Sequence, residues 1–165
     1  MINRLFIVML IISNFSFSGI KFGIDISSEI ETNIEDFDGE LEKNIVLAYE
    51  NIKEESSGGF GIEYVLESRL EYSECDILSL YGIYEFYKDK EIRFFGKIGY
   101  SIPEITLWDF SYPEPNFEGG IMFGFQINFG RNLQLSYSSH SGEYHFPYYE
   151  SYDIDLKRIT VFQLF

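Results

Sequence analysis

Apolar and polar residues alternate one by one along most of the chain after its first eighteen residues. Successive side chains of a β-strand point to opposite faces, so alternation sustained over about four to eight residues predicts a strand with two different faces. The segments with this pattern are 20–26, 44–50, 59–66, 79–86, 92–101, 120–129, 133–138 and 159–165. The sequence therefore predicts an all-β protein with eight strands.

The polar faces of these predicted strands are rich in glycine and carry both signs of charge. The glycines on these faces are Gly23, Gly59, Gly61, Gly99, Gly120 and Gly124, and the charged residues are Lys21, Arg93, Lys97, Asp25, Glu63 and Glu85. A solvent-exposed strand face has no need of glycine, which weakens a strand. The interior of an eight-stranded barrel is only just wide enough for side chains, and buried charges must be paired. The pattern therefore favours a membrane barrel with a polar lumen over a soluble sandwich or lipocalin-like barrel.

The connections between the predicted strands alternate between short and long. Turns are expected at 51–57, 88–90 and 130–132, and the longer connections are expected at 29–42, 67–76, 103–118 and 140–153. Outer-membrane barrels have short turns on one side and longer loops on the other. Closure also satisfies every backbone group, which lipid requires. The expected fold is an eight-stranded antiparallel up-and-down transmembrane β-barrel.

The first eighteen residues have the pattern of a secretory signal peptide. Arg4 precedes an unbroken apolar run at 5–12, and Ser16 and Ser18 are small residues just before Gly19. The apolar run is too short for a transmembrane helix, which needs about 20 residues. We therefore expect a signal peptide over 1–18, export of the chain, and one barrel domain over 19–165.

Composition narrows the function further. The 165 residues include 12 Lys and Arg against 27 Asp and Glu, which gives a net charge of −15. Such a chain lacks the clustered positive charge that binding to nucleic-acid phosphates requires. An aromatic content of 19% is too high for an acidic disordered chain. The single cysteine, Cys75, excludes an internal disulfide and a multi-cysteine metal site, and we read it as an incidental thiol.

Acidic residues concentrate in the long connections. Taken as 29–42, 67–76, 104–118 and 143–155, these windows hold 19 of the 27 acidic residues and one basic residue, Arg69. The densest group is Glu29, Glu31, Glu35, Asp36, Asp38, Glu40 and Glu42, whereas the opposite turns carry Lys53, Lys88, Lys90 and Arg131. Charge runs of this kind usually form a solvated surface. The alternative is a surface for divalent cations or cationic partners, without a defined metal site because the spacing of a calcium-binding loop is absent.

In several segments the chain resembles the small eight-stranded outer-membrane proteins of Gram-negative-type bacteria, the OmpA/OmpX-like barrel domains. The resemblance spans 19–165 and depends on the leader and on the segments 20–26, 80–84, 96–100 and 158–165. It implies a monomer in the cell outer membrane, in contact with outer-membrane lipid and lipopolysaccharide. It also implies that the barrel-assembly machinery recognises the terminal Phe165.

The last predicted strand departs from the family pattern in two ways. The family usually has an aromatic residue two positions before the end, where this chain has Gln163. In addition, Ile154 and Leu156 are out of phase with Ile159 and Val161, as is Tyr152. The phase difference predicts a bulge or register change in this strand.

We expect a structural or surface-interaction role in adhesion, envelope integrity or recognition, without enzymatic activity, cofactor or large pore. Ser138, His140 and Glu143 resemble in type the Ser, His and acid of outer-membrane lipid A deacylases. However, Ser138 and His140 share the predicted lumen face, whereas a lipid-modifying site must open outward, and their order is the reverse of the deacylase order. His145 is expected in a loop rather than in a catalytic or metal site. Two alternatives remain: a lipid-modifying barrel that uses His140 with Ser138 or Ser141, and a soluble secreted barrel that binds an apolar ligand.

Overall fold

The computed structural model describes residues 19–32, 39–41, 43–53, 57–70, 73–107, 116–130, 132–145 and 151–164. The expected signal peptide and Phe165 lie outside these residues. The strands are β1 (Ile20–Thr32), β2 (Gly39–Glu40), β3 (Ile45–Lys53), β4 (Gly58–Leu70), β5 (Ser73–Lys88), β6 (Ile92–Leu107), β7 (Asn116–Phe129), β8 (Leu133–His145) and β9 (Ser151–Leu164). Within the described residues, no helix is long and apolar enough to cross a membrane.

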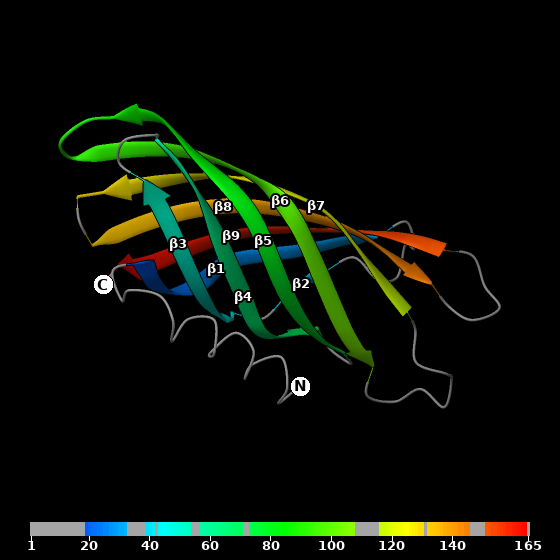
Figure 1. Cartoon of the computed structure of the whole chain (residues 1–165). Helices are drawn as coiled ribbons and strands as arrows, with labels where there is room; N and C mark the ends of the chain where they lie inside the picture. Colours follow the sequence, from blue (N-terminus) through cyan, green and yellow to red (C-terminus); the bar gives the residue numbers. More distant parts are fainter. Residues whose placement is uncertain are drawn as a thin grey trace.

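The strands form one antiparallel sheet that closes on itself. From β3 onward each strand pairs with the next in sequence, and β9 pairs with β1 from Lys21↔Leu164 to Thr32↔Ile154. The two-residue β2 pairs with β1 in the same register as β3, so β2 and β3 share one position in the barrel. In Figure 1 the strands β3 to β5 cross in front of β8, β9 and β1 at a steep angle. The predicted eight-stranded antiparallel barrel is confirmed.

The sequence alternation corresponds to the outside and inside of this barrel. Large apolar side chains are exposed on the outer surface at Phe22, Ile24, Ile26, Ile45, Phe60, Leu80, Tyr84, Phe86, Tyr87, Ile92, Ile98, Tyr100, Ile102, Ile121, Phe123, Phe125, Phe129 and Leu133. We call this set the apolar belt. The residues between them on each strand, such as Lys21, Glu63 and Lys97, are buried in the interior.

Several strands extend further from the short turns than the alternation predicted. The expected long connection at 67–76 is wrong, because β4 and β5 remain paired as far as Leu70↔Ser73 and leave only 71–72 outside the described residues. Strands β1, β6, β7, β8 and β9 likewise occupy parts of the other expected connections. Buried Cys75 packs inside this extension, in a segment that was expected to be a loop.

At this end of the barrel the inner face is apolar and the outer face is polar, which is the reverse of the arrangement at the apolar belt. The interior holds an apolar cluster that includes Ile30, Val65, Ile77, Ile154 and Leu156. The outer face carries exposed acidic residues, which we call the acidic wall: Glu29, Glu31, Glu40, Glu118, Glu143, Asp153 and Asp155. This part of the barrel therefore has the apolar interior and polar surface of a soluble protein.

This exchange also accounts for the phase change in the last strand. No register shift separates β8 and β9 along their whole ladder, so the bulge or register change expected in β9 is wrong. Ile154 and Leu156 are simply buried on the same inner face as Arg158. A bulge does occur, but in β1, where Ile26 is the extra residue opposite Ile159 and Thr160.

Close packing inside the barrel predicts which glycines tolerate a side chain. A Cβ atom at Gly99 would lie 2.1 Å from the carbonyl oxygen of Leu80 and 2.5 Å from the Cα atom of Tyr81, whereas a Cβ atom at Gly96 would meet nothing within 4 Å. We expect Gly99→Ala to lower the free energy of unfolding by about 1–3 kcal/mol, because the backbone must move. Gly96→Ala is the matched control and should change it little. Equal urea-unfolding curves for the two variants would contradict the close packing.

Candidate functional site

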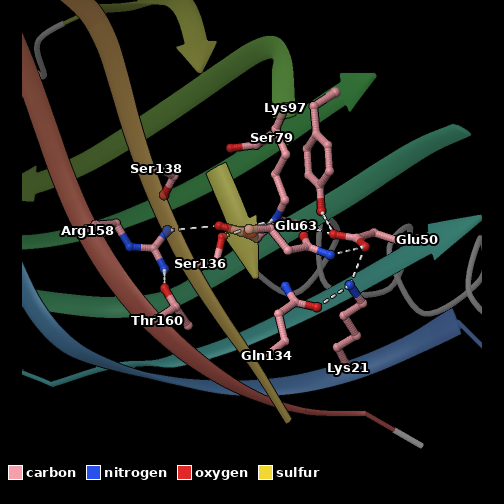
Figure 2. Close-up of polar contacts among 12 residues, drawn as sticks. Lys21, Glu50, Glu63, Ser79, Lys97, Gln134, Ser136, Ser138, Arg158 and Thr160 are labelled. Carbon is pink, nitrogen blue, oxygen red and sulfur yellow. Dashed lines mark hydrogen bonds and ion pairs between the residues drawn. The ribbon is translucent and has the colours of Figure 1, made fainter. Parts of the chain in front are cut away.

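The interior at the level of the belt is filled by a network of charged side chains, and Arg158 lies at one end of it. Its guanidinium donates from Nε and Nη2 to the two carboxylate oxygens of Asp25, over 2.9 and 2.8 Å. Nη1 donates to Glu63 over 3.2 Å. Thr160 donates to Asp25 over 2.6 Å, and Figure 2 shows Thr160 beside the guanidinium. Because Arg158 is almost completely buried, these contacts replace its hydration.

Glu50 is the centre of the other half of the network. Lys21 binds Glu50 and donates to the Gln134 side-chain oxygen over 2.5 Å, as Figure 2 shows. The Tyr81 hydroxyl donates to Glu50 over 2.9 Å, and the Gln126 amide donates over 3.2 Å. The carboxylate therefore has three kinds of donor in a space closed to solvent.

Lys97 joins the two halves of this network. Its ammonium group lies 3.2 Å from Glu50 and 3.8 Å from Glu63, and Figure 2 shows it between the two. It also donates to the Ser136 hydroxyl over 3.3 Å and lies 4.7 Å from the centre of the Tyr81 ring. Lys97 thus connects carboxylates that come from β3 and β4.

Charges of opposite sign are balanced in this network. Among the described residues, its cations are Lys21, Lys97 and Arg158, and its anions are Asp25, Glu50 and Glu63. The expected pairing across the lumen is confirmed for Lys97 with Glu63. Arg93 pairs with Glu85 on the neighbouring strand, near the β5–β6 turn.

Two charged members of the network, Arg158 and Glu50, were not predicted from the sequence. The alternation could have identified both. It places Ile159 and Tyr49 on the outer face, so Arg158, which directly precedes Ile159, and Glu50, which directly follows Tyr49, belong to the inner face. Because a register change was expected in the last strand, the alternation was not used there to assign Arg158 to the lumen.

His140 lies inside the barrel between two serine hydroxyls. Its Nε2 atom is 2.9 Å from Ser138 Oγ, and its Nδ1 atom is 3.3 Å from Ser79 Oγ. Glu143 is instead exposed and lies 3.6 Å from His145. The structure thus brings Ser138 and His140 together on the predicted lumen face but leaves Glu143 apart. The Ser141 hydroxyl is also engaged elsewhere, because it donates to the Ile121 carbonyl over 3.1 Å.

Neither Cys75 nor any acidic group forms a metal centre in the described part of the chain. Cys75 is buried, and its thiol donates only weakly to the Asp76 carbonyl, over 3.9 Å. Among the residues that the structure describes, no three His, Cys, Asp or Glu side chains gather as ligands for a metal ion.

The acidic wall places like charges directly beside one another. Glu118 on β7 is paired with Glu143 on β8, and Glu143 is paired with Asp153 on β9. Like charges opposite one another in a sheet are destabilising. His145 lies 3.8 Å from Glu118, so one imidazole faces two carboxylates of this row.

Lys157, a basic residue outside the four acidic connections, lies against the acidic wall. Lys157 donates to both oxygens of Glu31 over 2.6 Å, so Arg69 is not the one base near these acids. Of the densest acidic group in the sequence, only Glu29, Glu31 and Glu40 lie within the described residues. Glu35, Asp36, Asp38 and Glu42 lie outside them.

Adjacent residues of β9 provide a direct test of the buried network. We expect Arg158→Met to lower the free energy of unfolding by about 3–5 kcal/mol, because it leaves Asp25 and Glu63 buried without their cation. Lys157→Met removes the neighbouring, exposed cation and should change the stability little, because water screens its pair with Glu31. Urea unfolding of the refolded protein measures both. If the two variants were equally stable, Arg158 would not hold the network together.

The comparisons with known proteins give a fold but no sequence family. No family model matches the chain, and no curated protein matches it. The fold is similar to that of Ail, the attachment invasion locus protein of Yersinia pestis, with a TM-score of 0.58, 11% identity, and coverage of 89% of this chain and 97% of that one. Neisserial surface protein A has a TM-score of 0.56, 10% identity, and coverage of 90% and 98%. The outer membrane enzyme PagL has a TM-score of 0.51, 12% identity, and coverage of 85% and 97%. The chain therefore has the fold of the small eight-stranded outer-membrane barrels.

Proposed function

We propose that this protein is an outer-membrane β-barrel with a structural or surface-interaction role. The observation that carries the proposal is the exchange of character between the two ends of the barrel. The belt has apolar side chains outside and paired charges inside, which suits lipid around the barrel. The wall has acidic side chains outside and an apolar interior, which suits water around it.

Strand length agrees with this placement. Seven of the strands are 13 to 16 residues long. A tilted strand needs only about 9–11 residues to cross the hydrocarbon region. The remaining residues would raise the acidic wall above the membrane, on the side away from the short turns.

The proposed partners follow from this orientation. The belt would contact outer-membrane lipid, and the wall would lie among lipopolysaccharide phosphates, with divalent cations between the two sets of negative charge. The wall would also attract cationic extracellular proteins. Insertion through the barrel-assembly machinery by way of Phe165, and export by a signal peptide, belong to the same proposal.

The other roles considered for the sequence have less support in the geometry. A large pore does not suit a lumen that the charged network fills. A soluble ligand-binding barrel does not suit an apolar outer surface. A lipid-modifying enzyme needs its catalytic pair on the outside, whereas Ser138 and His140 are buried within the barrel.

Membrane insertion is the first property to test. We expect the refolded protein to float with phospholipid vesicles and to migrate differently on a denaturing gel before and after boiling, because closed barrels resist detergent until heated. Ile98→Arg places a charge on an outward side chain that is 69% exposed. In vesicles it should lower the free energy of unfolding by about 2–4 kcal/mol if Ile98 lies near the middle of the membrane.

A matched variant separates lipid from water as the surroundings of the belt. Glu143→Arg makes a charged substitution on the acidic wall, beyond the belt, and should not lower the stability, because it places an opposite charge between Glu118 and Asp153. A protein that stays in the buffer without detergent, unaffected by Ile98→Arg, would rule out the membrane placement.

The acidic wall predicts binding of cationic partners that weakens with salt. The double variant Glu143→Gln/Asp153→Asn should weaken the binding of a lysine-rich peptide at low ionic strength by about fivefold for each charge pair lost, and by about 30-fold if both are lost, since one charge pair in contact is worth about 1 kcal/mol in water. The effect should shrink at physiological salt, where the screening length is about 8 Å. Isothermal titration calorimetry on the protein in detergent measures both.

The control removes the same two kinds of acid at the opposite end of the barrel. Asp89→Asn/Glu91→Gln alters the exposed β5–β6 turn and keeps the acidic wall intact. If this variant reduced peptide binding as much as the wall variant, the peptide would be responding to net charge alone.

A further inference from the structure

The outer surface of the belt has a hollow over β4 to β7 with a volume of about 520 Å³. Its rim is formed by outward-facing Tyr84, Phe86, Ile98, Phe123 and Phe125. Its floor is formed by Gly58, Gly82, Gly96 and the backbone of the strands between them. We call this hollow the glycine groove.

The packing of the barrel does not require glycine at two of the floor positions, Gly82 and Gly96. A Cβ atom at Gly96 would meet nothing within 4 Å, and one at Gly82 would come no closer than 3.8 Å to the Ile98 carbonyl oxygen. By contrast, a Cβ atom at Gly61 would lie 2.4 Å from the Tyr81 ring. Outward strand positions normally carry branched or aromatic side chains. At Gly82 and Gly96 the protein instead leaves space toward its surroundings.

The lining of the groove selects an apolar occupant. Lys97 contributes only its backbone, because its side chain points into the lumen toward Glu50. The Tyr84 hydroxyl is then the one polar side-chain group among the lining residues. The floor strands are paired on both sides, for example Tyr84 with Gly58 and with Gly96, so no strand edge is available for an added β-strand.

The size of the groove argues against a second protein chain. Twelve residues line it, whereas a stable protein interface usually involves about 20–30 residues on each side. A flexible hydrocarbon chain is slender enough to follow such a hollow and gains many small dispersion contacts along it.

The groove lies in the half of the belt next to the short turns. Phe86 is two residues from the end of β5 at Lys88, and Gly96 is four residues from the start of β6 at Ile92. Beyond this end, the exposed turn carries Lys88 and Lys90 together with Asp89 and Glu91, so its charges balance. The site would therefore select for a hydrocarbon chain rather than for a charged headgroup.

We propose that the glycine groove binds one acyl chain of a phospholipid in the leaflet next to the short turns. The inference rests on the proposed membrane placement. The groove would then be a defined binding site for lipid on an outer surface that elsewhere contacts only bulk lipid.

The test uses the full barrel refolded into phosphatidylcholine vesicles that contain phosphatidylcholine with a photoreactive acyl chain. After illumination, mass spectrometry maps the labelled residues. We expect Tyr84, Phe86, Phe123 and Phe125 to be labelled about threefold or more above Phe22 and Ile24, which are exposed on β1, across the barrel from β5 and β6. In Gly82→Leu/Gly96→Leu, which fills the groove, labelling of the rim should fall to that lower level.

The control is Val161→Phe, which enlarges an outward side chain away from the groove and should keep the wild-type labelling pattern. Gly82→Ala/Gly96→Ala provides a smaller filling with an intermediate loss, and the shift on heating confirms that each variant is folded. Uniform labelling around the belt of a protein that floats with the vesicles would overturn the lipid site alone. An unlabelled rim in a refolded protein that is a dimer, with the dimer lost in the leucine variant, would overturn it in favour of a second copy of the chain. Failure to float would overturn the membrane placement and the lipid site together.

Discussion

The pairing of β1 with β9 is the constraint on which the rest of the structure depends. It joins the two ends of the sheet over eleven residue pairs, interrupted only by the bulge at Ile26. Without it, both strands would expose rows of unpaired N–H and C=O groups, which lipid cannot satisfy. Closure with eight strand positions also makes the lumen narrow. Glycines where strands approach closely, and a lumen packed with side chains, follow from that width.

The narrow lumen explains why its charges form a balanced network. A carboxylate such as Glu50 cannot remain ionised in a closed space unless cations and donors replace its water, and Lys21, Lys97 and Tyr81 do so. Because these residues come from four strands, the network ties together parts of the barrel wall that the backbone ladder joins only stepwise. Arg158 does the same for β1, β4 and β9.

Alternation predicted the strands, the closed barrel and the inward charges because each depends only on which face a residue occupies. It did not predict how far the strands extend, because the wall reverses the pattern, so Ile154 and Leu156 looked out of phase while remaining on the inner face. The partners of Arg158 could not be predicted either, because Asp25 and Glu63 lie on other strands and the stagger between those strands is set by closure of the barrel. The pairing of Lys157 with Glu31 depends on the same β1–β9 register.

Identities of 10–12% with proteins of the same fold are consistent with this constraint. Closure and alternation specify the kind of residue at each position, apolar outside and polar or small inside, but seldom the residue itself. A shared barrel therefore transfers no role from Ail or PagL to this chain. The features that distinguish this protein must therefore lie at positions where the alternation does not determine the residue. The row of Glu118, Glu143 and Asp153 is such a place, because it keeps like charges adjacent at a cost in stability that the fold does not require.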